Sequence, residues 1–211
     1  MAKKQIQLLI AVVVVIAAAG WAYRSNSGPS VKFDLTPYNA LGNGTAAVTA
    51  KLIGNQGQVV VVALDTREFN DPVMEGQLKS FEQALQKTRV KIAGTTRFKL
   101  TPMERMGTGG AVPAALLAKA MQEHPGLSAL VLFCPYPMDF VPPKPGEPKF
   151  VVASGYLPVY RRLIEAQLIS AAIVPRFDRA ETTSPKAKTL KDSFEEEFVV
   201  VTPENLTSLP Y

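Results

Sequence analysis

The sequence has very little of the chemistry that builds disulfides and metal sites. It holds one cysteine, Cys134, and one histidine, His124, in 211 residues. A disulfide needs two cysteines, and a cysteine–histidine metal site needs several such ligands. A thiol or hydroxyl nucleophile also needs a base beside it, and histidine is the usual one. We therefore expect no disulfide, no bound metal and no cofactor.

The main part of the chain also lacks a strong charge of one sign. Lys and Arg number 23, while Asp and Glu number 18. Three of the basic residues lie among the first thirty residues, which contain no acid, so elsewhere bases exceed acids by only two. Domains that bind nucleic acids carry a pronounced basic patch. A nucleic acid is therefore not an expected partner.

The first residues of the chain contain a long uncharged run. Lys3 and Lys4 precede residues 5–23, which are mostly apolar. A helix of that length spans about 28 Å, close to the hydrocarbon core of a bilayer. The lysines predict that this end stays in the cytoplasm, and Trp21 suits the far interface. We expect residues 1–23 to anchor the protein in the inner membrane by a single pass, with the folded domain on the periplasmic side.

A cleaved signal peptide is the alternative for this segment. Residues 17–19 are three alanines, which fit the small-residue pattern of a cleavage site. Both alternatives export the rest of the chain. Residues 24–44 are rich in Gly, Ser, Asn and Pro and predict a linker, so the folded domain is expected at residues 45–211.

Short apolar runs alternate with helical patterns after residue 44. Runs typical of buried strands lie at residues 59–64, 90–94, 127–133, 150–153, 170–174 and 197–201. Helices are predicted at residues 45–53, 71–85, 113–123 and 157–168, and in the last of these Val159, Leu163 and Ile164 are expected to face the core. Residues 107–110 and 178–196 are expected to be loops, and residues 135–148 a stiff proline-rich excursion.

This alternation predicts a single three-layer α/β domain with a mostly parallel sheet of about five to six strands. In such sheets, ligands bind outside the carboxyl ends of the strands. Aromatic and charged residues follow several of the predicted strands there. We expect these residues to bind a ligand: Asp65, Arg67, Tyr136, Tyr156 and Arg176.

The candidate reactive groups have no catalytic setting in the sequence. Residues 107–110 are glycine-rich but lack the Lys-Ser/Thr pair of a phosphate loop. Ser154 lacks the flanking glycine of a nucleophile elbow. Cys134 is expected to be a buried, inert thiol. We therefore expect a protein that is not an enzyme.

Five segments follow one another in an order that resembles a known family. They are residues 45–62, Gln77–Leu85, Leu117–Val131, Tyr156–Val174 and Phe198–Asn205. Together they resemble the second lobe of type I periplasmic sugar-binding proteins, the ribose- and galactose-binding class, whose fold recurs in lactose-repressor-like regulators. The resemblance implies the same α/β fold and a small, sugar-like ligand.

The sequence departs from this family where the resemblance implies contacts with sugar. The family's arginine, its Asn-Asp pair and its aspartate fall on Gln77, on Cys134 and Pro135, and on Gly155. We therefore expect a degenerate sugar site. The first lobe has no counterpart, so two copies could pair as a homodimer to rebuild a cleft.

Taken together, these patterns indicate a membrane-tethered, extracytoplasmic binding domain that performs no chemistry. Its partner would be a small, sugar-like molecule or a protein of the cell envelope. The alternative is a structural accessory subunit of an envelope membrane complex, docked through the anchor helix and the proline-rich segment. An enzyme is the third interpretation.

Overall fold

The computed structural model describes Trp21 and residues 34–67, 71–144, 147–155, 157–176 and 189–209. The chain from Leu35 onward forms one compact unit. The predicted anchor, residues 1–23, lies outside the described residues except for Trp21, and so does the predicted linker before Asp34. Within the described part of the chain, no helix has the length and apolar character needed to cross a bilayer.

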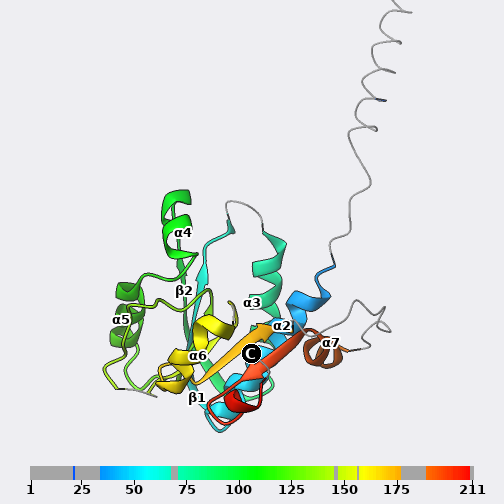
Figure 1. Ribbon diagram of the computed structural model, residues 1–211. Helices are drawn as coiled ribbons and strands as arrows, with labels where there is room; N and C mark the ends of the chain where they lie inside the picture. Colours follow the sequence, from blue (N-terminus) through cyan, green and yellow to red (C-terminus); the bar gives the residue numbers. More distant parts are fainter. Residues whose placement is uncertain are drawn as a thin grey trace, which may run out of the picture. The chain divides into compact units, whose positions relative to one another are not determined.

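A six-stranded sheet forms the centre of the domain (Figure 1). Its order is β2-β1-β3-β4-β5-β6. The strands are β1 (Gln56–Leu64), β2 (Arg89–Phe98), β3 (Ala129–Phe133), β4 (Lys149–Val152), β5 (Ala171–Pro175) and β6 (Phe198–Val201). The first five are parallel, and β6 runs antiparallel to β5. The predicted single α/β domain with a mostly parallel sheet is confirmed.

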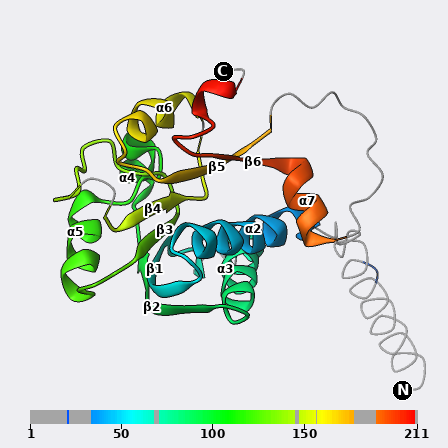
Figure 2. The ribbon, with the colours of Figure 1, turned by 90° about the horizontal axis from the view of Figure 1, so that it is seen from below.

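Helices cover both faces of this sheet (Figure 2). The helices of the domain are α2 (Thr36–Leu52), α3 (Pro72–Leu85), α4 (Pro102–Thr108), α5 (Ala114–Glu123), α6 (Leu157–Glu165) and α7 (Leu190–Glu197), with a short 3-10 turn at Leu206–Ser208. Buried residues of α2 and α3 share one hydrophobic cluster, and buried residues of α5 and α6 share another. The sheet lies between the two clusters, which gives three layers.

Strand β1 contributes to both clusters. Val60 and Val62 belong to the cluster with α5 and α6, whereas Val59, Val61 and Ala63 belong to the cluster with α2 and α3. All five are fully buried. Side chains alternate across a strand, so a continuous apolar run is what a strand covered on both faces requires.

Helix α3 forms where its sequence predicts. The side chain of Asp71 accepts a hydrogen bond from the backbone N–H of Val73 (2.9 Å) and caps the helix, and Pro72 occupies the first turn. Leu78, Phe81 and Leu85 are buried along one face, as their spacing indicates.

The folded domain begins earlier than residue 45, the start that the sequence predicts, because helix α2 starts before it. It begins at Thr36, so residues 36–44, which the sequence placed in the linker, form its first half. Gly42 and Gly44 are buried there. A Cβ atom built on Gly42 would lie 2.1 Å from the carbonyl oxygen of Gln77 in α3, and one on Gly44 would lie 2.1 Å from the ring of Phe194 in α7. These glycines therefore permit close helix packing rather than flexibility.

Two further helices occupy segments expected to be loops. Helix α4 includes residues 107 and 108, and α7 lies within residues 178–196 apart from its last residue. Each begins with a reciprocal capping box, Thr101 with Glu104 and Thr189 with Asp192.

The core-facing side of α6 also differs from the prediction. Val159, which was expected to face the core, is 47% exposed, and Tyr160 takes the buried position.

The contact between α2 and α3 yields a test. Gly42→Ala is expected to lower the free energy of unfolding by about 1–3 kcal/mol, because the new methyl group overlaps a backbone atom. Gly107→Ala is the matched control, since it also lies inside a helix and its added Cβ has no atom within 4 Å apart from its chain neighbours and its own helix backbone. The control is expected to be neutral or to stabilise by up to about 1 kcal/mol. Urea unfolding measures both, and equal stability of the two variants would contradict the close packing.

Candidate functional site

A large cavity lies at the carboxyl edge of the sheet. It has a volume of about 680 Å³, and we call it the edge pocket. Its wall comes from Leu100 after β2, from α4 and the segment leading to α5, from Pro135–Asp139 after β3, from Gly155 after β4, and from Val159 and Tyr160 of α6. A second cavity of about 460 Å³ lies at the ends of β1, β3 and β4, between Leu64, Phe133 and Ser154.

The strand order explains why cavities form here. The connection after β1 leads to β2 on one side, whereas the connection after the neighbouring strand β3 leads to β4 on the other side. Loops that diverge at such a switch point leave a crevice outside the carboxyl ends of the strands. The second cavity lies at this point, and the edge pocket opens beside it, sharing Gly109 and Pro135.

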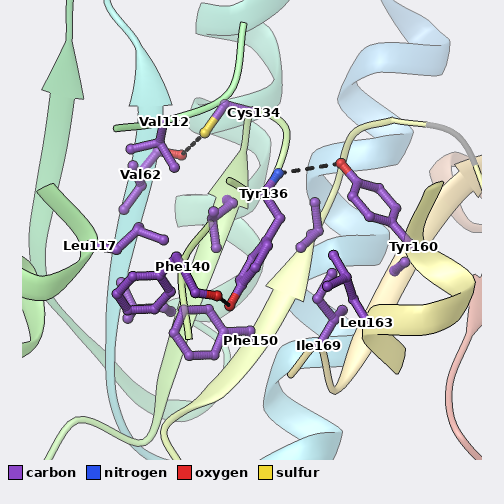
Figure 3. Packing of buried hydrophobic residues seen from close by; sticks show 14 of the residues in the cluster. Val62, Val112, Leu117, Cys134, Tyr136, Phe140, Phe150, Tyr160, Leu163 and Ile169 are labelled. Carbon is purple, nitrogen blue, oxygen red and sulfur yellow. Dashed lines mark hydrogen bonds between the residues drawn. The ribbon is translucent and has the colours of Figure 1, made fainter. Parts of the chain in front are cut away.

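Tyr136 lines the edge pocket and is fixed there by two hydrogen bonds and a ring contact (Figure 3). Its hydroxyl donates to the carbonyl oxygen of Phe140 (3.0 Å), and its backbone N–H donates to the hydroxyl of Tyr160 (3.4 Å). Its ring meets that of Phe150 edge to face at 5.6 Å. Burial raises the pKa of Tyr136 and raises the pKa of Tyr160 to about 12, so both phenols are neutral at pH 7.

Tyr160 also explains why the pocket has no acid after β4. Gly155 has φ +99°, and a Cβ built on it would lie 2.4 Å from the Tyr160 hydroxyl oxygen. The aspartate that the family resemblance implies at this position has no room beside that ring. The conformation and the contact both require glycine.

Asp65 and Arg67 follow β1 and bind each other. Arg67 Nε and Nη2 donate to the two carboxylate oxygens of Asp65 at 2.9 and 2.8 Å. These hydrogen bonds hold the pKa of Asp65 well below its usual range. Beside them Arg97 pairs with Glu75, and this contact lowers the pKa of Glu75. Asp65 and Arg67 do not line the edge pocket.

Arg176 binds the end of α7 and does not line the edge pocket. Its Nε donates to the carbonyl oxygens of Glu195 (3.0 Å) and Phe198 (3.1 Å), and its backbone N–H donates to that of Glu197 (2.9 Å). These acceptors lie at the end of α7, where the last carbonyls of a helix lack intrahelical partners. Arg176 therefore secures α7 against β5. Tyr156 lies outside the described residues.

Four of the five residues expected to bind a ligand are described, and these four do not converge on one point. Tyr136 lines the edge pocket, Asp65 and Arg67 form an ion pair at another strand end, and Arg176 caps a helix. The sequence analysis missed Glu104 and Asp139, the charged residues of the edge pocket. The spacing of Thr101 and Glu104 was the available signal, because it marks the start of α4.

Cys134 is buried, as predicted. It is 4% exposed, and its thiol donates to the carbonyl oxygen of Val62 at 3.9 Å. Burial raises the pKa of the thiol to about 12, so the reactive thiolate is not populated at neutral pH. The predicted burial of Cys134 is confirmed.

Comparison with known proteins gives a likeness of structure alone. No protein-family model matches the sequence, and no curated protein does. An ABC transporter solute-binding protein from Burkholderia graminis in complex with D-arabinose superposes with a TM-score of 0.56 at 14% identity, over 82% of this chain and 62% of that one. The arabinose-binding protein AraP from Geobacillus stearothermophilus gives 0.52 at 13% identity, over 82% and 63%. GanP, a glucose-galactose binding protein from the same organism, gives 0.50 at 12% identity, over 83% and 62%.

These likenesses show the fold. The domain has the α/β architecture of a periplasmic-binding-protein-like lobe. The matched region spans less than two thirds of the length of each of these three proteins.

The ion pair after β1 gives a pH prediction. Arg67→Met is expected to raise the pKa of Asp65 toward the ordinary value of about 3.9, because it removes the donors and the charge that favour the carboxylate. A depressed folded-state pKa stabilises the fold above the unfolded-state pKa, and this stabilisation is lost as pH falls toward the folded-state value. The variant should therefore lose less stability than the wild type on acidification below about pH 4.

Carbon-13 NMR titration of the Asp65 carboxyl measures this shift directly. Lys119→Met serves as the control, because Lys119 pairs with Glu123 on α5 and does not contact Asp65. An identical Asp65 titration in the wild type and in Arg67→Met would contradict the assigned pairing.

Proposed function

We propose that this protein is a membrane-tethered, extracytoplasmic binding domain that uses the edge pocket to hold a ligand and performs no chemistry. The observation that carries the proposal is the position of the pocket, at the carboxyl edge of a mostly parallel sheet and beside its switch point. Its volume falls in the range typical of small-molecule sites. The structural neighbours named above are binding proteins, which agrees with a role in binding.

The proposal includes a degenerate sugar site. Gln77, on which the family's arginine falls, is 8% exposed, lies under α2 and does not line the edge pocket. Cys134 is buried in the core, and Tyr160 occupies the space beside Gly155. A sugar needs several convergent hydrogen-bonding groups, so these three positions support binding of a different ligand or a different mode of binding.

A thermal-shift screen of the purified protein against sugars, nucleosides, small acids and small amines tests ligand binding. A ligand at a hundredfold its dissociation constant adds about 2.7 kcal/mol of stability and raises the melting temperature by several degrees. Gly107→Trp should remove the shift, because Gly107 lines the pocket with open space around it. Lys119→Trp, an exposed α5 residue outside the pocket, should keep it. A flat screen would contradict small-molecule binding.

Tethering to the membrane is supported by the composition of residues 1–23. Two lysines precede an uncharged apolar run of the length that spans a bilayer. With alkaline phosphatase fused after Tyr211, we expect phosphatase activity outside the cytoplasm and retention in membranes washed with carbonate. Deletion of residues 5–23 should abolish both. If the carbonate wash releases the fusion while its phosphatase activity is retained, the segment is a cleaved signal peptide. If the intact fusion has no phosphatase activity, export is contradicted.

A second candidate function is docking as an accessory subunit of an envelope complex. Large apolar side chains are exposed on α4 and in the proline-rich segment: Met103 84%, Met106 87%, Met138 62% and Val141 68%. Exposed apolar surface of this kind marks sites of protein contact. A stoichiometric membrane partner that is lost in Met106→Asp and kept in Lys119→Asp would favour docking. Two copies of the protein could also pair at this edge as a homodimer. Sedimentation across a wide concentration range tests this, and a monomer at every concentration would contradict it.

A further inference from the structure

The wall of the edge pocket is mainly apolar. Leu100, Val112, Pro113, Pro137, Met138 and Val159 contribute side chains without hydrogen-bonding groups. A sugar placed against them would lose the hydration of its hydroxyls without replacement, which costs free energy for each hydroxyl. The wall therefore favours a ligand with an apolar body.

Most polar side chains of the wall already have partners within the protein. The hydroxyl of Thr108 donates to the carbonyl oxygen of Glu104 (2.8 Å), and that of Tyr136 donates to Phe140 (3.0 Å). The hydroxyl of Tyr160 accepts the backbone N–H of Tyr136 (3.4 Å). Few neutral polar groups are thus left to recognise a polyhydroxylated ligand.

The charged residues of the wall carry one sign. Glu104 on α4 and Asp139 after β3 line the pocket, and among the described residues no lysine or arginine does. Glu104 is held by the backbone N–H of Thr101 (2.7 Å), and this contact lowers its pKa, so it stays ionised near neutral pH. Its neighbour Arg105 borders the second cavity instead.

From this combination we infer that the edge pocket takes a small organic cation, an ammonium group joined to an apolar body. The inference rests on the proposed function, because it assumes that the edge pocket is the binding site. The apolar body lies against the prolines and valines of the wall, and the ammonium group lies between the carboxylates of Glu104 and Asp139. Met138, at 62% exposure, lies at the mouth and packs on the ligand with its adaptable thioether.

Methionine-methyl NMR of the full-length protein provides the test. Met138 is the reporter, and Met121, which packs against the core from α5, is the internal reference. The probes are phenethylamine, its anionic counterpart hydrocinnamate, and D-arabinose. Phenethylamine is expected to shift the Met138 signal saturably without moving that of Met121, while hydrocinnamate binds at least about fivefold more weakly.

Charge-neutralising variants locate the ammonium group. Glu104→Gln keeps the capping box, because glutamine serves at that position as well. Glu104→Gln and Asp139→Asn are each expected to raise the dissociation constant of phenethylamine about two- to fivefold, and together about tenfold. Glu123→Gln, an exposed α5 residue outside the pocket, is the matched control and should change nothing.

Three results would overturn the inference. They are equal binding of hydrocinnamate and phenethylamine, unchanged binding of phenethylamine by the double variant, and no Met138 shift with phenethylamine. A Met138 shift with D-arabinose alone would also refute the cationic ligand while leaving the proposed binding function standing. The proposed function itself is decided separately, by the wider thermal-shift screen with Gly107→Trp.

Discussion

Burial of β1 on both faces is the constraint on which the rest of the domain depends. Its alternating side chains supply both hydrophobic clusters, so α2 and α3 must lie on one face while α5 and α6 lie on the other. Strands β2 and β3 then pair on its two sides, both parallel to it. The loops after β1 and β3 consequently leave toward opposite sides of the sheet, and the cavities form at the edge where they diverge.

Close packing around the pocket determines its chemistry as much as the identity of its residues does. Tyr160 fills the space beside Gly155 and accepts a hydrogen bond from Tyr136, so one buried ring both supports the loop after β3 and excludes a longer side chain after β4. This part of the fold therefore presents an apolar wall, whereas a sugar ligand would need several hydrogen-bonding groups. Fold alone does not specify the ligand, because the site is built by the loops.

The sequence predicted the layers well because strands buried on both faces and the stripe of α3 leave strong local patterns. It failed where only tertiary contacts carry the information. The role of Gly42 depends on Gln77, which lies in another helix, and α4 buries no residue and so shows no apolar stripe. For the candidate site, Arg176 follows a strand as expected, but its acceptors lie about twenty residues away at the end of α7. Local patterns do not reveal such partners.

The acidic side chains after β1 pair with arginines of the chain, whereas those of the edge pocket do not share their wall with a cation among the described residues. This difference supports binding at the edge pocket. After β1, the carboxylate of Asp65 is satisfied by Arg67, and Glu75 is satisfied by Arg97, so that part of the edge is largely neutralised within the chain. At the edge pocket, Glu104 and Asp139 border an apolar wall that contributes no cation of its own among the described residues. The acids after β1 already have cationic partners within the chain, so the acids of the edge pocket are the ones that our inference assigns to an external cation.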